Sequence, residues 1–142
     1  MTSGPLLDLA WAITAIAAFG GSILRGGTPR LAGGVVCVAW TLSLAVDGHD
    51  WPRERLLLFA IDLVLTLILV WMTRTCRAAW LIFTAASAVL LLVNYGVSTI
   101  LPTVHPWAFV SVSHLWSAFI LLGLIWGAVI GDRSRTPGIN RP

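Results

Sequence analysis

The stretch LLLFAIDLVLTLILVWMT, residues 56–73, decides the fold class of this chain. Asp62 is the one charged side chain within it. An α-helix rises about 1.5 Å per residue, so these residues would form a rod about 27 Å long, close to the ~30 Å thickness of a membrane's hydrocarbon core. We therefore interpret the stretch as a membrane-spanning helix.

The composition extends this interpretation to the whole chain. The protein has 142 residues, of which 58% are hydrophobic and 11% are charged. Soluble domains usually carry about a quarter charged residues. A soluble core of this size cannot hide so much apolar surface, because folding leaves roughly a third of the extended surface in water. The excess apolar side chains are expected to face lipid.

Five long apolar segments are separated by turn residues, and they predict an all-α, polytopic transmembrane helical bundle. All seven prolines lie outside them, as expected from the cost of Pro inside a helix. The second segment is short, so it is a tilted span, a re-entrant helix or a span lengthened by its neighbours. The segments run from Leu6 to Leu24, Leu31 to Val46, Leu56 to Thr73, Ala78 to Leu101 and Phe109 to Ile130.

The arginines predict the orientation, because cytoplasmic loops retain positive charge. Five spans place three Arg-containing regions on one side, whereas four spans would divide them; Arg53 and Arg55 lie on the opposite side, in a loop of mixed charge from Asp47 to Arg55. Residues 1–130 thus form one transmembrane domain with its N-terminus outside, and residues 131–142 form a short polar cytoplasmic tail. We expect a multi-pass protein of the cell's inner (cytoplasmic) membrane. The regions contain Arg25 and Arg30, Arg74 and Arg77, and Arg133, Arg135 and Arg141.

Six of the eight tryptophans are expected to form aromatic belts at the two membrane interfaces. Trp40 and Trp116 do not fit such belts and are expected to pack between helices. The outer belt would contain Trp11, Trp51 and Trp107, and the inner belt Trp71, Trp80 and Trp126.

Small residues at one-turn spacing predict close helix packing. Gly123, Gly127 and Gly131 lie on one face of the last segment, where another backbone can approach closely. That neighbour is either a helix of the same chain or a second copy. Similar rows occur in the first segment, which includes Gly21, and in the second, which includes Gly33.

Three spans place a strongly polar residue at a similar depth. Asp62, Asn94 and His114 each lie about 10 Å from the expected outer boundary, counted at 1.5 Å per residue. Isolating a carboxyl group in hydrocarbon is costly, so Asp62 is expected to face the bundle interior. The layer is either a ligand or proton site or a closed structural network. Hydroxyl residues on the same helix faces extend it: Thr66, Ser98 and Ser117.

Several chemistries are not supported by the sequence. Two Cys and three dispersed His show no metal-ligand spacing, and a single His within a span argues against bis-His haem. No nucleophile, base and oxyanion donors occur together, so we expect no enzyme activity and no cofactor. The arginines occur singly or in pairs rather than as a phosphate-binding stripe, so we expect no nucleic-acid binding.

These observations favour a structural or accessory membrane subunit that packs through its small-residue helix faces. Its expected partners are membrane lipid and either further copies of itself or a larger membrane complex. One alternative is a protein that binds or transports a small ligand, a proton or a cation through the polar layer. A second alternative is a holin-like pore former.

Labelling of single-cysteine variants tests the predicted orientation, in a background where Cys37 and Cys76 are replaced by Ala. Cysteine at Thr103 should react with a membrane-impermeant thiol reagent added to intact cells, and cysteine at Thr136 should not. The physical reason is the retention of Arg-rich loops in the cytoplasm. The reverse labelling pattern would exclude five spans with the N-terminus outside.

Overall fold

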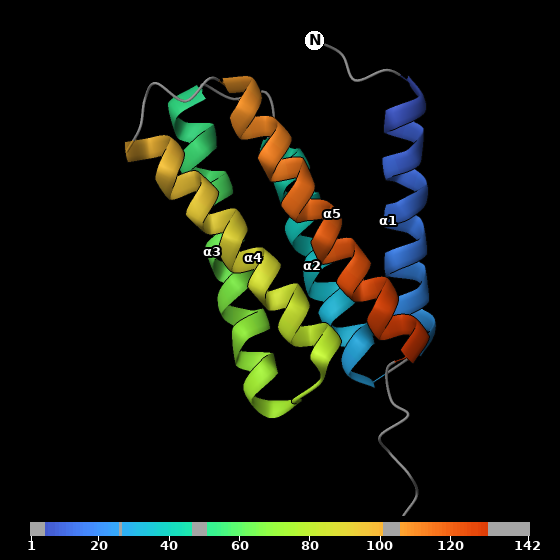
Figure 1. The fold of residues 1–142 in the computed structure, drawn as a ribbon. Helices are drawn as coiled ribbons and strands as arrows, with labels where there is room; N and C mark the ends of the chain where they lie inside the picture. Colours follow the sequence, from blue (N-terminus) through green and yellow to red (C-terminus); the bar gives the residue numbers. More distant parts are fainter. Residues whose placement is uncertain (1–4, 26, 47–50, 101–105, 131–142) are drawn as a thin grey trace, which may run out of the picture.

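The computed structural model describes residues 5–25, 27–46, 51–100 and 106–130, and these residues form five α-helices (Figure 1). Side chains are described for residues 11–24, 27–46, 56–98 and 108–130. The predicted tail from 131 to 142, which includes Gly131, lies outside the described residues. The helices are α1 (Pro5–Arg25), α2 (Gly27–Val46), α3 (Trp51–Thr75), α4 (Ala79–Ile100) and α5 (Pro106–Ile130).

The all-helical architecture predicted from the sequence is confirmed. Helix α1 begins one residue before its predicted segment, and α2, α3 and α5 begin three to five residues before theirs. The first turns of these last three helices contain Pro29, Pro52 and Pro106. Proline is tolerated there because backbone N–H groups in the first turn have no partner within the helix. The prolines therefore start helices rather than lie between them.

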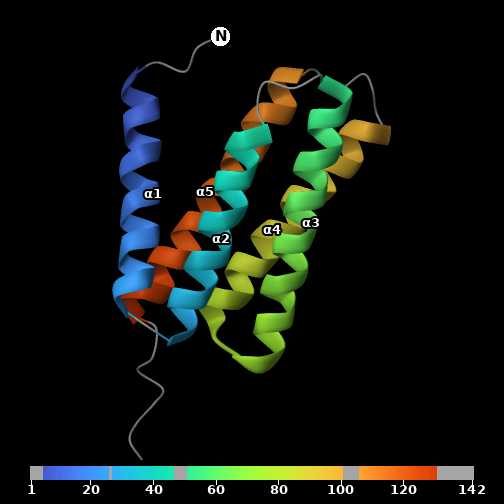
Figure 2. The same ribbon diagram turned by 180° about the vertical axis from the view of Figure 1, so that it is seen from behind.

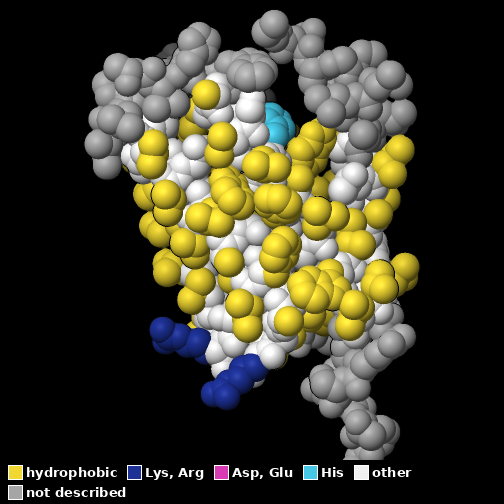
Figure 3. Space-filling model, viewed as in Figure 1, with side chains coloured by type: hydrophobic (Ala, Val, Ile, Leu, Met, Phe, Trp, Pro, Cys, Tyr) yellow, Lys and Arg dark blue, Asp and Glu magenta, His cyan; other side chains and the backbone are white. Residues whose placement is uncertain are grey.

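Within the described residues, four helices are long and apolar enough to cross a membrane. They contain the spans Gly27–Val46, Leu56–Thr75, Ala79–Ser98 and Ala108–Ile130, whereas the apolar stretch found in α1, Trp11–Leu24, is shorter. Apolar side chains cover the middle of the visible surface, and arginines appear at one end of it (Figure 3). This distribution is what a membrane protein needs, because its lateral surface contacts lipid.

Successive helices run in opposite directions, so the connections alternate between two ends of the bundle (Figures 1 and 2). The α1–α2 and α3–α4 turns share one end, where Arg30 starts α2 and Arg74 ends α3. We call this the arginine end. Gly27 makes the first turn possible, because its φ of 61° is a conformation that L side chains rarely adopt.

The helices form a closed ring in the order of the chain. Each helix packs against the next, α5 packs against α1, and α2 also contacts α5 across the ring. Thus α1 lies beside α2 and α5, and makes no contact with α3 or α4 among the described residues (Figure 2). The first and last helices therefore close the bundle.

The α4–α5 contact depends on two glycines of the predicted packing face. A Cβ atom at Gly127 would lie 2.6 Å from Cδ2 of the Trp80 indole, and one at Gly123 would overlap the Thr84 hydroxyl. The Thr84 hydroxyl donates a hydrogen bond to the Trp80 carbonyl at 2.8 Å, so it needs no partner on α5. The structure thus places a helix of the same chain against Gly123 and Gly127.

Two further small-residue contacts hold α1. A Cβ atom at Gly33 of α2 would lie 2.6 Å from the Ser22 Cβ, and one at Gly21 would lie 3.3 Å from the Ala128 Cβ of α5. The buried Ser22 hydroxyl donates to the Ala18 carbonyl at 2.6 Å. All of these contacts, including those of Gly123 and Gly127, lie in the half of the bundle near the arginine end.

Trp80 differs from its expected place in the inner aromatic belt. It is only 5% exposed and fills the space above Gly127, whereas Trp71 is 67% exposed. The glycine removes a side chain from α5, and the indole of α4 occupies the resulting space. Local packing therefore determines the position of Trp80.

Substitution of Gly127 tests the α4–α5 contact. Gly127→Leu should lower the free energy of unfolding by at least about 1–3 kcal/mol, because the new side chain must displace the Trp80 indole. Thermal unfolding of the detergent-solubilised protein measures this loss.

Gly20→Leu is the matched control, since nothing lies within 4 Å of a Cβ at that position. Leu122→Ala removes a side chain that is 51% exposed and should also have little effect. Equal stability of Gly127→Leu and Gly20→Leu would contradict the observed packing.

Candidate functional site

A cavity of about 470 Å³ lies between the helices, in the half of the bundle away from the arginine end. All five helices contribute side chains to it. We call it the central cavity. It occurs where the small-residue contacts no longer hold the helices together. Its polar side chains are Ser43, Asp62, Tyr95, Ser113, His114 and Ser117.

Three of the residues predicted for the polar layer line this cavity. They are Asp62 of α3, together with His114 and Ser117 of α5. Asp62 lies eleven positions after the start of α3, which is about 16 Å along the helix. The central cavity therefore reaches deep into the bundle.

The Asp62 carboxyl group has a hydrogen-bond donor on the neighbouring helix. The Tyr95 hydroxyl of α4 donates to it. No arginine lines the central cavity among the described residues. The carboxyl group thus has a neutral donor and an adjacent cavity, rather than a cationic partner.

His114 has a defined tautomer when neutral. Its Nδ1 lies 2.8 Å from the Val110 carbonyl oxygen, and a carbonyl can only accept, so Nδ1 carries the proton. The Nε2 atom is then the acceptor. The side chain is exposed, and Figure 3 shows a histidine near the end of the bundle opposite the arginines. His114 therefore links the central cavity to the molecular surface.

Two tryptophans form part of the cavity wall. Trp11 of α1 and Trp40 of α2 have ring centroids 6.1 Å apart and an interplanar angle of 49°. Trp40 also packs edge-on against Phe19 at 5.9 Å, and Trp11 lies 5.6 Å from the His114 ring. Such tilted pairs are favourable aromatic contacts and restrict the orientation of both indoles.

Asn94 has a different environment from the one expected. Its Nδ2 donates to the Ser113 hydroxyl at 2.9 Å and lies 3.4 Å from the Phe109 carbonyl. It does not line the central cavity. Asn94 instead ties α4 to α5 beside the cavity, and it helps to position Ser113.

Two predicted hydroxyl residues bond to their own helices. Thr66 donates to the Asp62 carbonyl at 2.7 Å, and Ser98 donates to the Tyr95 carbonyl at 2.8 Å. Neither lines the central cavity. A Ser or Thr in a helix satisfies its hydroxyl in this way without a partner on another helix.

Sequence reasoning missed Tyr95, Ser43 and Ser113 and assigned Trp11 to an interface belt. Tyr95 had a usable signal, because it is the single tyrosine in the chain and follows the polar residue Asn94. Trp40 also had one, since it did not fit either belt. The neighbours of these residues across the bundle depend on helix rotation, which the sequence alone does not specify.

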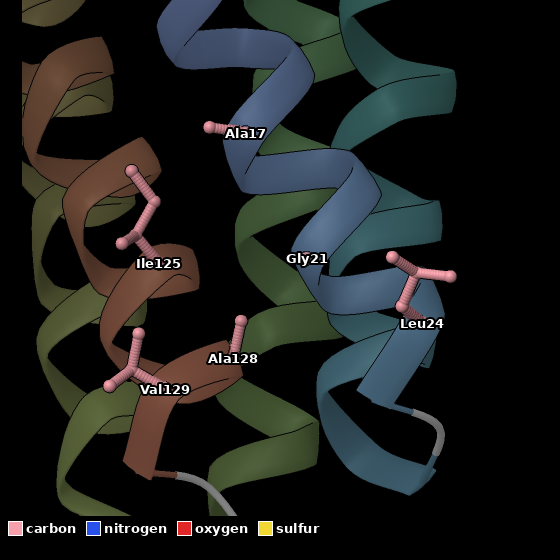
Figure 4. A pocket seen from close by; sticks show the side chains of 6 residues that line it. All are labelled: Ala17, Gly21, Leu24, Ile125, Ala128 and Val129. Atoms are coloured by element: carbon pink, nitrogen blue, oxygen red, sulfur yellow. The ribbon is translucent and has the colours of Figure 1, made fainter.

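Two further cavities among the described residues are mainly apolar. One, of about 330 Å³, lies between α1 and α5 and is lined by small and aliphatic side chains, including Ala17, Gly21 and Ile125 (Figure 4). The other, of about 680 Å³, is a groove between α2 and α3 with Arg30 as its one charged residue among those described. No cluster of potential metal ligands occurs among the described residues. The central cavity is thus the most polar of the three.

A double-mutant cycle tests the hydrogen bond between Asp62 and Tyr95. Asp62→Leu should destabilise the protein by about 1–3 kcal/mol, because the Tyr95 hydroxyl loses its acceptor inside the membrane. In a Tyr95→Phe background, Asp62→Leu should lower the free energy of unfolding much less, because the hydroxyl that would lose its acceptor is absent. Thermal unfolding of the single and double variants should give a coupling energy of about 0.5–3 kcal/mol. Strictly additive losses would show that the two side chains do not interact.

Comparison with known protein families, with curated proteins and with solved structures finds no match to this chain. The chemistry of the central cavity is therefore the basis for proposing a function.

Proposed function

We propose that this small integral membrane protein binds a small ligand or cation in the central cavity. The observation that carries the proposal is the placement of Asp62 beside a cavity of about 470 Å³ to which all five helices contribute. Ligand sites in proteins usually measure about 300–1,000 Å³ and combine apolar walls with a few polar groups. An ionisable residue within a membrane span is costly to bury, so its presence there commonly indicates a function.

Two features favour ligand binding over a purely structural role. A closed structural network would join Asp62 to Asn94 or to a hydroxyl; the Tyr95 hydroxyl does donate to Asp62, but Asn94 bonds to Ser113 and Asp62 still lines the central cavity. The accessory-subunit hypothesis relied on an available glycine face, and α4 covers that face at Gly123 and Gly127. One chain also suffices to line the central cavity.

We propose further that all five helices cross the cytoplasmic membrane, with the N-terminus outside. The shared location of the α1–α2 and α3–α4 turns supports this orientation, because Arg30, Arg74 and Arg77 then lie on the cytoplasmic side. The central cavity would consequently lie in the outer half of the membrane.

The proposed role is binding without chemical conversion. The Ser113 hydroxyl donates to the Phe109 carbonyl at 2.9 Å, and His114 Nδ1 is engaged by Val110. Nucleophilic catalysis would instead require a serine hydroxyl that donates to a base. These hydrogen bonds support a static polar lining.

Ligand-dependent stabilisation tests the proposed function. The purified protein should gain thermal stability with at least one member of a panel of alkali, alkaline-earth and organic cations. A ligand at one hundred times its Kd adds about 2.7 kcal/mol to the free energy of unfolding. Asp62→Asn should keep the fold, since the amide can still accept from Tyr95, but it should lose this gain.

Ser87→Ala is a suitable control, because Ser87 is buried, bonds to the Phe83 carbonyl and lies outside the central cavity. It should retain the ligand-dependent gain. If no cation stabilises the wild-type protein more than Asp62→Asn, the proposed binding function is wrong.

A further inference from the structure

We propose that the ligand of the central cavity is an organic ammonium ion, held between the Asp62 carboxylate and the indoles of Trp11 and Trp40. This inference rests on the proposed function and names the ligand class. It follows from three properties of the cavity: its charge, its aromatic wall and the scarcity of available oxygen ligands.

The charge of the cavity favours a cation. Among the residues whose side chains the structure describes, Asp62 is the one acid that lines the cavity, and Arg30, Arg74 and Arg77 do not line it. An ionised carboxylate in a medium of low dielectric constant is stabilised strongly by a nearby positive charge. No arginine among the residues with described side chains supplies such a charge there, so a cationic ligand would supply it.

The aromatic wall favours an organic cation. Trp11 and Trp40 both line the cavity, and their rings lie 6.1 Å apart and are inclined by 49°. Cations are attracted to the faces of aromatic rings, and Trp binds them best, which is why ammonium ligands are often held in aromatic cages. Tyr95, which donates to Asp62, adds a third aromatic side chain.

The oxygen atoms of the cavity do not suit a divalent metal. Calcium and magnesium require about six to eight oxygen ligands. Among the described side chains Asp62 provides the one carboxylate of the lining, the other side-chain oxygens are neutral hydroxyls, and the Ser113 oxygen already accepts a hydrogen bond from Asn94. Much of the remaining wall is aliphatic, including Leu65 and Ile120. Alkyl groups on an ammonium nitrogen would contact such a wall favourably.

The same cavity offers a route for the ligand. His114 lines the cavity and is also exposed on the surface, at the junction where it contacts Trp11 of α1. Gly21 and Ala128 hold α1 and α5 together near the arginine end. The contact between His114 and Trp11 lies in the opposite half of this helix pair. An ammonium ion would pass between α1 and α5 and meet the indoles before it reaches Asp62.

The decisive comparison uses a choline-sized trimethylammonium ion and its neutral tert-butyl isostere, titrated into the wild-type protein by calorimetry. The two probes have the same shape, so their difference reports recognition of charge. We expect the ammonium ion to bind at least about tenfold more tightly, as a carboxylate and cation–π contacts predict. This comparison needs no variant and therefore does not depend on the folding of one.

Variants then assign the contacts. Trp40→Leu should weaken ammonium binding by about 3- to 30-fold, and Trp40→Phe should weaken it less, because phenylalanine keeps an aromatic face. Asp62→Asn should reduce the preference for the charged probe. Trp71→Leu is the matched control, since Trp71 is 67% exposed and lies outside the central cavity. It should bind both probes as the wild type does.

The outcomes separate the two proposals. Equal binding of the ammonium ion and its isostere would overturn the ligand class. Asp62-dependent stabilisation by an alkali or alkaline-earth ion, without any preference for ammonium, would overturn it as well but retain the cavity as a cation site. No binding of any cation by the wild-type protein would overturn both.

Discussion

Close contact between helices at small residues is the constraint on which the rest of this structure depends. Lipid chains are as apolar as leucine, so helices in a membrane gain little from hiding apolar surface and associate through close packing. Gly33 against Ser22 and Gly127 against Trp80 provide such packing, and both contacts lie near the arginine end. At the other end no glycine contact holds the described helices together, and the central cavity lies there. The close packing at one end and the cavity at the other thus both follow from the positions of the small residues.

The cavity places costly groups where lipid cannot satisfy them. An apolar side chain in place of Asp62 would avoid the cost of burying a carboxyl group. The chain instead has this acid beside the central cavity, with the Tyr95 hydroxyl as its hydrogen-bond donor. Nearby hydroxyls are satisfied by carbonyls of their own helices, as in Ser43 and Ser113. The carboxyl group is consequently the part of the lining best able to interact with a guest.

The sequence predicted the helices well because segment length and the placement of proline are physical limits on a membrane span. It predicted the contents of the site less completely. Counting residues along a helix predicts the depth of a side chain, and Asp62 and His114 do line one cavity. Asn94 has a similar expected depth, but its side chain donates a hydrogen bond to Ser113 outside that cavity. Helix rotation decides between these outcomes, and it depends on packing across the bundle. Trp80 illustrates the same limit, because its position depends on the missing side chain at Gly127.

The contact between α1 and α5 joins the two described helices that lie farthest apart along the sequence. Because α5 is translated after the other described helices, the side of α1 that packs against it has no partner until α5 has been made. The helix that completes the ring also brings His114, Ser113 and Ser117 to the cavity. Ring closure and completion of the pocket are therefore the same late event in biosynthesis. A chain truncated before α5 would retain Asp62 but would lack the α5 side of the cavity beside it.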